Sequence, residues 1–143
     1  MAMCLLGMKD EAVRLTEMIN PISHTENRQD VQKYKIEPYV IPGDIYSNKY
    51  MPGRGGWSWY TGSSSWYYKL ILENILGFKK EGTKLFLPQT IPSNWDKFEI
   101  QYRYKSNLYN IKVEKKNKNE EKKIIKFIEL KNENKIENIE IKL

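Results

Sequence analysis

Residues 53–68 read Gly-Arg-Gly-Gly-Trp-Ser-Trp-Tyr-Thr-Gly-Ser-Ser-Ser-Trp-Tyr-Tyr, and they join glycines, hydroxyls and six aromatic side chains. Glycine lets a backbone approach a ligand closely, and tryptophan and tyrosine offer flat apolar faces that suit sugar rings. Free N–H groups at a helix start beside Thr61-Gly62-Ser63 suit an anion. Sugar and phosphate are therefore the first ligands to consider. The spacing alone favours another interpretation, a glycine-rich turn that leads into a buried aromatic helix.

Two apolar patterns of helical period occur in this part of the chain, one before the quoted stretch and one that begins within it. The first covers residues 2–20 and ends at Asn20-Pro21, and the second covers residues 64–76, with Gly77 placed as the residue after the helix. Residues 21–56 hold four prolines and no sustained period, which predicts mostly loop. Two helices joined by a long loop cannot close a core of their own.

From Lys84 the apolar period changes from helical to two. Residues 98–104 alternate strictly between apolar and polar, and residues 109–113 do the same after a Lys105-Ser106-Asn107 turn. This pattern predicts a β-hairpin. The apolar patterns of three other segments predict further strands, over residues 84–87, 124–130 and 136–143. A helical part followed by a β part predicts the α+β class, with a boundary near residues 77–88.

The charge of the chain is dispersed. The net charge is +6, but the last 32 residues hold 10 basic and 7 acidic side chains that alternate. A phosphate backbone requires a concentrated basic patch, so a nucleic-acid partner is not predicted. Cys4 is the only cysteine, which excludes an intrachain disulfide. No apolar run reaches the length of a membrane-spanning helix, and a cytoplasmic chain, or the cytoplasmic part of a larger protein, is expected.

Several separate motifs, in register, resemble the C-terminal end of glycoside hydrolase family 94. They are residues 20–24 (Asn-Pro-Ile-Ser-His), 34–40 (Tyr-Lys-Ile-Glu-Pro-Tyr-Val), 53–63, 75–77 (Ile-Leu-Gly), 91–95 (Ile-Pro-Ser-Asn-Trp) and the 98–104 strand. The family comprises cellobiose and chitobiose phosphorylases and the phosphorylase-like domain of cyclic β-1,2-glucan synthases. The resemblance covers Ala2 to Val113 and leaves out the tail that follows Glu114. Residues 57–63 are most similar to the glucan synthase branch.

The resemblance implies a fold and a division of the chain. Residues 1–80 would be the last helices and loops of an (α/α)6 barrel that carries the active-site loop, and residues 81–143 a small antiparallel β-domain. The first helix has no N-cap residue before its apolar face. We therefore expect a fragment, truncated or separately encoded, of a longer glycoside phosphorylase or glucan synthase.

The resemblance also implies a reaction and a phosphate site. In the family a threonine-glycine pair binds the attacking phosphate, and it matches Thr61 and Gly62. An aspartic acid protonates the glycosidic oxygen while phosphate attacks the anomeric carbon with inversion, so that no general base is needed. That aspartate and the phosphate-binding histidine and arginine belong to a segment upstream of the matched one. No catalytic residue is therefore expected in this chain, and the isolated chain is expected to lack turnover.

Other polar and aromatic residues near the glycine loop are candidates for substrate or loop contacts. Glu37 is expected to fix the loop through hydrogen bonds, while Asp44 does likewise or faces the sugar. Arg54 reaches an anion or is an exposed turn residue. Trp57 and Trp59 alternate, so that one faces the site and the other the core. No metal site and no cofactor are predicted, and inorganic phosphate is the co-substrate of the parent enzyme.

Three classes of function remain to be weighed. The preferred one is part of an enzyme that acts on β-linked glucans or glucosides with inorganic phosphate. The alternative is a non-catalytic carbohydrate-binding or protein-interaction module, and a nucleic-acid binder is the weakest. Because two barrel helices without partners expose apolar faces, self-association or docking to the missing barrel segment is also expected.

Overall fold

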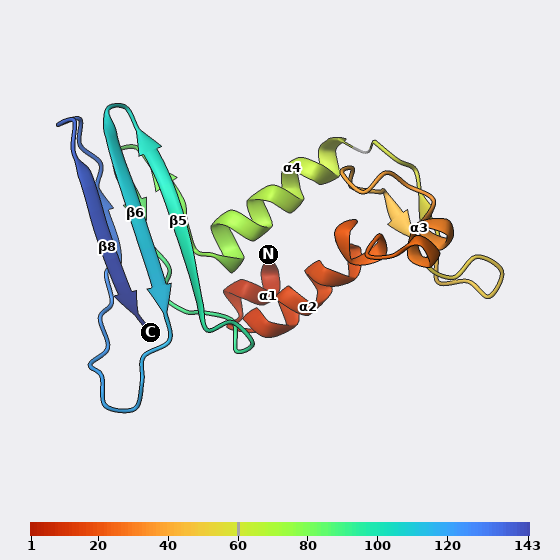
Figure 1. Ribbon diagram of the computed structural model, residues 1–143, viewed down its shortest axis with the longest axis horizontal. Coiled ribbons are helices and arrows are strands. Elements are labelled where there is room, and N and C mark those ends of the chain that lie inside the picture. The colour runs from red at the N-terminus through yellow and green to blue at the C-terminus, as the bar shows by residue number, and fades with distance from the viewer. Residues whose placement is uncertain (60) are drawn as a thin grey trace. The chain divides into compact units, whose positions relative to one another are not determined.

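The computed structural model describes residues 1–59 and 61–143, the side chain of Thr61 excepted. It divides into two compact units, Met1–Ile71 and Leu72–Leu143. The first unit is built mainly from helices, and the second contains two three-stranded sheets (Figure 1). The mixed α and β content agrees with the predicted class. The barrel and the domain boundary between residues 80 and 81 stay predictions.

The N-terminal helical pattern forms two helices rather than one. Helix α1 covers Ala2–Leu5 and helix α2 covers Lys9–Ile19. The chain breaks at Gly7, whose φ of 79° lies in the left-handed region where glycine carries no steric penalty. The single predicted helix over residues 2–20 is therefore wrong at residues 6–8, because the apolar period continues across a glycine that redirects the backbone.

The predicted loop over residues 21–56 holds two short helices. A 3-10 helix, η1, covers Ile22–His24, and α3 covers Arg28–Tyr34. The Asn27 side chain caps α3 by accepting hydrogen bonds from the backbone N–H groups of Gln29 and Asp30 at 2.9 and 3.0 Å. A helix of 7 residues is too short to show a sustained apolar period, which is why sequence periodicity missed it.

The second predicted helix is present and begins earlier than expected. Helix α4 covers Thr61–Lys69 and continues as a π-helix, η2, over Leu70–Ile75. The predicted terminating residue Gly77 has a φ of 72°, as the position after a helix requires. The aromatic side chains Trp66 and Tyr68 of α4 are exposed, so this helix is not the buried aromatic helix that the spacing favours.

The second unit contains the predicted strands and one more. One antiparallel sheet consists of β3 (Lys79–Glu81), β4 (Lys84–Phe86) and β7 (Phe127–Glu129). The other has the order β5 (Lys97–Tyr104), β6 (Asn107–Glu114) and β8 (Ile136–Lys142) (Figure 1). Strands β5 and β6 form the predicted hairpin, but β8 pairs with β6 in parallel. The β part is thus not wholly antiparallel as predicted.

The core of the second unit comes from alternate positions of its strands. Tyr109, Ile111 and Val113 of β6 are buried, as the period of two requires. They belong to one apolar cluster whose other buried members are Phe78, Leu85, Leu87, Leu130 and Ile141. Helix and strand residues from Leu72 to Leu143 thus supply a closed core within this unit.

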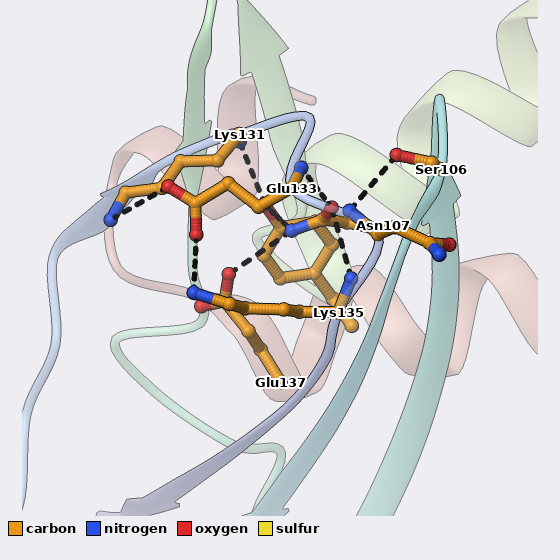
Figure 2. A network of polar contacts seen from close by, with 8 residues as sticks. Ser106, Asn107, Lys131, Glu133, Lys135 and Glu137 are labelled. Atoms are coloured by element: carbon orange, nitrogen blue, oxygen red, sulfur yellow. Dashed lines mark hydrogen bonds and ion pairs between the residues drawn. The ribbon is translucent and has the colours of Figure 1, made fainter.

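A buried polar network fixes the segment that leads into β8 (Figure 2). The Asn107 side chain is 0% exposed, and its Oδ1 accepts hydrogen bonds from the backbone N–H groups of Glu133 and Lys135 at 2.7 and 3.4 Å. The Tyr109 hydroxyl accepts from the N–H of Lys131 at 2.9 Å. Side chains of β6 therefore satisfy the backbone of the turn before β8, which positions that strand for parallel pairing.

Candidate functional site

The glycine-rich stretch closes a two-stranded hairpin in the first unit. Strand β1 (Asp44–Ile45) pairs antiparallel with β2 (Gly55–Gly56), so that Asp44 faces Gly56. The N–H of Gly43 donates to the carbonyl oxygens of Gly56 and Trp57 at 3.1 and 3.0 Å. These backbone bonds place the aromatic residues that follow β2 beside the start of β1.

Two of the glycines are needed for packing within the protein. A Cβ on Gly55 would lie 2.6 Å from Ile36 Cδ1 and 2.9 Å from Tyr34 Cε2. A Cβ on Gly56 would overlap the Asp44 carboxylate and the Tyr46 hydroxyl. Both glycines are buried, so they bring the hairpin close to its own neighbours and not to a ligand.

Trp57 and Trp59 carry an unusual backbone conformation. Their φ angles are 52° and 61°, in the left-handed region that bulky side chains rarely occupy. Both side chains are exposed, at 76% and 60%. The prediction that one of the two tryptophans faces the core is therefore wrong. The positive φ at both positions ends the alternation of side chains that a strand would give. Exposed aromatics held in a strained backbone are typical of binding sites.

The Trp59 indole lies beside two residues of the Glu37-Pro38-Tyr39 motif. Its Nε1 donates to Glu37 Oε1 at 3.3 Å, and its ring meets that of Tyr39 edge to face with centroids 6.0 Å apart. Glu37 is half-buried, and Tyr39 is exposed. The geometry agrees with a loop-fixing role for Glu37. It also presents Trp59 and Tyr39 as neighbouring exposed aromatic faces.

Helix α4 begins at the residues predicted to hold phosphate. Gly62 lies in its first turn, where backbone N–H groups lack partners within the helix. Nothing lies within 4 Å of a Cβ built on Gly62, so the space above this glycine is open. The Thr61 side chain and Tyr60 lie outside the described part of the chain, and the predicted threonine contact cannot be located there.

A groove of about 540 Å³, the α4 groove, runs along the helix start. Among the predicted site residues it includes Asp44 and Gly62. Most of its lining is apolar, and Ser63 adds a hydroxyl that donates to the Pro42 carbonyl at 3.5 Å. The remaining lining residues are Met1, Ile19, Ile41, Gly43, Ile45, Trp66, Tyr67 and Leu70.

The other predicted residues do not line this groove. Glu37 and Trp59 contact each other beside Tyr39, and Trp57 is exposed just after β2. Arg54 is an exposed residue of the hairpin loop, and its Nη1 donates to Met51 Sδ at 3.5 Å. The structure thus brings Asp44 and Gly62 together, pairs Glu37 with Trp59, and leaves Arg54 on the loop.

Sequence reasoning missed two contributors to the site. The sequence places Tyr39 in a motif without indicating its contact with Trp59, and it does not single out Trp66, which lines the groove. Tyr67 from the same helix donates its hydroxyl to the Thr16 carbonyl at 3.2 Å. Burial, helped by the charge of Glu17, raises the pKa of the Tyr67 hydroxyl, so it stays a donor that ties α4 to α2.

The single histidine has structural contacts. His24 stacks on Tyr34 with centroids 5.1 Å apart, and its Nε2 lies 2.7 Å from the Met18 carbonyl oxygen. That carbonyl is a pure acceptor, so the ring proton resides on Nε2. Among the described residues, no group of three His, Cys, Asp or Glu side chains is arranged to hold a metal ion. None of the described helices has the length and apolar character needed to cross a membrane.

Comparison with known proteins identifies relatives of this site. Residues 1–77 match the family described as "Glycosyl hydrolase 94 superfamily, catalytic domain". This range includes the hairpin, the exposed tryptophans and the whole of α4. The sequence features and the family match therefore agree on the same part of the chain.

Individual relatives extend the match into the second unit. The chain is 40% identical over 112 residues to the cyclic beta-(1,2)-glucan synthase NdvB of Rhizobium meliloti, which covers 78% of this chain and 4% of that protein. It is 32% identical over 111 residues to an N,N'-diacetylchitobiose phosphorylase of Vibrio proteolyticus, with 76% and 13% covered. A chitobiose phosphorylase of Vibrio furnissii is 29% identical over 114 residues, with 78% and 14% covered. The chain thus spans a small part of the length of these relatives.

Proposed function

Because the chain belongs to the glycosyl hydrolase 94 superfamily, we propose that it forms part of an enzyme acting on β-linked glucans with inorganic phosphate. It contributes part of the phosphate site and part of the sugar site. The observation that carries the proposal is Gly62, which is open to solvent in the first turn of α4 beside a groove. Related proteins named as phosphorylases and as a glucan synthase supply the reaction class.

The first turn of α4 suits phosphate for electrostatic reasons. Partial positive charge and free backbone N–H groups gather at a helix start, and both favour a bound anion. Glycine at position 62 lets an anion approach the backbone without meeting a Cβ. Thr61 precedes it in the sequence, and its hydroxyl would add a further donor. Phosphate bound here would be the attacking group of the proposed phosphorolysis.

The exposed aromatics suit the sugar. Trp59 and Tyr39 present neighbouring faces, with the Glu37 carboxylate at the indole nitrogen. Apolar faces of a pyranose ring pack on such side chains while carboxylates bind its hydroxyls. Asp44 on the rim of the α4 groove is a second carboxylate for sugar hydroxyls. Phosphate and sugar contacts would thus come from the Glu37-Pro38-Tyr39 motif, the hairpin after it and helix α4.

The general acid is proposed to lie outside this chain. The resemblance to the family assigns the role of general acid to none of the carboxylates in the matched motifs. A positioned proton donor accelerates such a reaction by roughly 10²–10⁴-fold, so its absence removes most of the turnover. The first unit also exposes large apolar side chains, with Leu5 at 84% and Leu6 at 75%. We propose that these side chains pack against further barrel helices, and that turnover requires them.

The test uses Gly62→Ala, titrated with inorganic phosphate and followed by backbone amide NMR. In the wild-type chain we expect phosphate to shift the amides of Gly62 and Ser63. The added Cβ meets no neighbouring atom and alanine favours a helix, so the variant should remain folded. It should weaken phosphate binding about tenfold, or roughly 1.4 kcal/mol. Ser64→Ala serves as the matched control, because Ser64 is exposed and lies two residues after Gly62 in the same helix.

Two results would overturn the phosphate assignment. One is a wild-type chain whose α4 amides ignore phosphate, and the other is a Gly62→Ala chain that binds phosphate as well as Ser64→Ala does. The exposed aromatics favour a second candidate, a non-catalytic carbohydrate-binding module. Titration with a glucose tetrasaccharide separates the two functions, since a module binds sugar equally with and without phosphate.

A further inference from the structure

The outer face of the β5–β6–β8 sheet carries an ordered row of amides. The strand register places Gln101, Asn110 and Asn138 directly abreast. Gln101 Nε2 donates to Asn110 Oδ1 at 3.1 Å, and Asn110 Nδ2 donates to Asn138 Oδ1 at 3.0 Å. Because side chains alternate across a strand, these residues point away from the core positions Tyr109 and Ile111. The amides therefore form a fixed polar row across all three strands.

A groove of about 680 Å³ lies over this row, and we call it the sheet groove. Its floor includes a second row, in which Glu99, Lys112 and Glu140 are abreast. Lys123 joins the lining from the segment before β7, and its backbone pairs with that of Lys142 through two 3.0 Å hydrogen bonds. The volume is within the range of about 300–1,000 Å³ typical of small-molecule sites.

The hydrogen bonds within the amide row leave one polar atom at each end of the row for a ligand. The amide row leaves Gln101 Oε1 as an acceptor and the Asn138 side-chain nitrogen as a donor. The Glu99 and Glu140 side chains are exposed and interact with the charge of Lys112, whose Nζ lies 2.7 Å from Glu114. A ligand that both donates and accepts along its length would satisfy these atoms together.

The charges restrict the class of that ligand. The lining holds two carboxylates, Glu99 and Glu140, and two lysines, Lys112 and Lys123, so its formal charges cancel. An anionic polymer needs a concentrated basic surface, and the two carboxylates oppose it. A cationic ligand is disfavoured as well, because the positively charged Lys112 lies between Glu99 and Glu140 in the strand register. The remaining class is a neutral, extended and hydroxyl-rich molecule, whose neighbouring hydroxyl groups match amide and carboxylate pairs.

We propose that the sheet groove is a second carbohydrate-binding site, which takes a neutral oligosaccharide along the amide row. It lies wholly in the second unit and uses none of the residues assigned to phosphate or sugar in the first. The choice of a glucose oligosaccharide as its probe rests on the proposed function. A site of this kind would hold a glucan chain without aromatic stacking, because no aromatic side chain lines the described groove.

The experiment titrates the full 143-residue chain with β-1,2-linked and β-1,4-linked glucose tetrasaccharides and follows side-chain and backbone amides by NMR. We expect the side-chain NH₂ signals of Gln101, Asn110 and Asn138 to shift on addition of sugar. Asn110→Val should weaken this binding at least tenfold, because it removes the centre of the row while valine suits a strand. Gln101→Val, at the edge strand, should weaken it as well and leaves the Asn110–Asn138 bond in place.

Arg103→Val is the matched control, since it lies on the same strand face as Gln101 but outside the lining residues. Equal loss of binding in Arg103→Val and Gln101→Val overturns the proposal, as does sugar that leaves the three side-chain amides unshifted. If sugar shifts only amides around Trp59, this proposal fails while the proposed function stands. If it shifts only the amide row, the second site is supported and the sugar site of the first unit fails.

Discussion

Tyr34 is the buried polar side chain with the least support from its neighbours. It is 1% exposed, and among the described residues its hydroxyl has no hydrogen-bond partner. Its ring is held by stacking on His24 and by the close backbone of Gly55. Burial raises the pKa of the Tyr34 hydroxyl above its ordinary value of 10. An unsatisfied buried hydroxyl costs about 1–3 kcal/mol, so packing of the ring outweighs that cost.

Tyr34→Phe removes this unpaired hydroxyl and should raise the free energy of unfolding at neutral pH by about 1 kcal/mol. Above pH 10 the unfolded chain loses the phenolic proton while the folded chain keeps it, so wild-type stability falls as pH rises toward the raised pKa. The variant lacks this part of the fall. Urea unfolding at pH 7 and pH 10.5 measures both effects, with the exposed Tyr68→Phe as control. A loss of stability in Tyr34→Phe at pH 7 would contradict the argument.

At the scale of elements, local sequence patterns predict where the strands lie better than they predict which strands pair. The strict alternation over residues 98–104 and 109–113 identified the β5–β6 hairpin, since a short turn brings adjacent strands together. The parallel pairing of β8 with β6 depends on Asn107, which the sequence indicated only as a turn residue. Its contacts with Glu133 and Lys135 are separated by 26 and 28 positions, beyond any local pattern.

Asn107→Ala should destabilise the second unit by roughly 1 kcal/mol, because it removes the acceptor of two part-buried hydrogen bonds from backbone N–H groups. Amide hydrogen exchange should accelerate in β8 more than in β5, since the network fixes the turn before β8. Asn132→Ala is the control: its Oδ1 accepts from Ser106 in an exposed contact, and its loss should cost much less. Uniform acceleration across the three strands would show that Asn107 supports the unit as a whole rather than the placement of β8.

At the scale of the whole chain, the order of a helical part and a β part was predictable from the change of apolar period. The candidate site was predictable only in part. Glycine and aromatic spacing located the hairpin and the start of α4, but not the positive φ of Trp57 and Trp59 or the contact of Trp59 with Tyr39. Those features depend on where the backbone turns after β2, and no residue pattern specifies a positive φ at a tryptophan.

The two units should differ in their ability to fold alone. Every member of the apolar cluster around Tyr109 and Ile111 lies between Leu72 and Leu143, so a chain of residues 72–143 contains its complete core. The first unit instead exposes many large apolar side chains, among them Leu5, Leu6 and Ile22. Apolar area buried on folding is the main source of stability, at about 25 cal/mol per Å². Residues 72–143 should therefore unfold cooperatively in urea with dispersed NMR signals.

Residues 1–71 alone should bind a hydrophobic dye and associate in gel filtration, because their apolar side chains lack partners. Exposed leucines are expected to cause this association, so Leu5→Lys with Leu6→Lys should make the same piece more soluble. Ser64→Lys, which adds charge at an exposed polar position, is the control and should leave association unchanged. A monodisperse residue 1–71 piece with a cooperative urea transition would show that the first unit closes its own core, and the proposal that it packs against further barrel helices would then lose its physical reason.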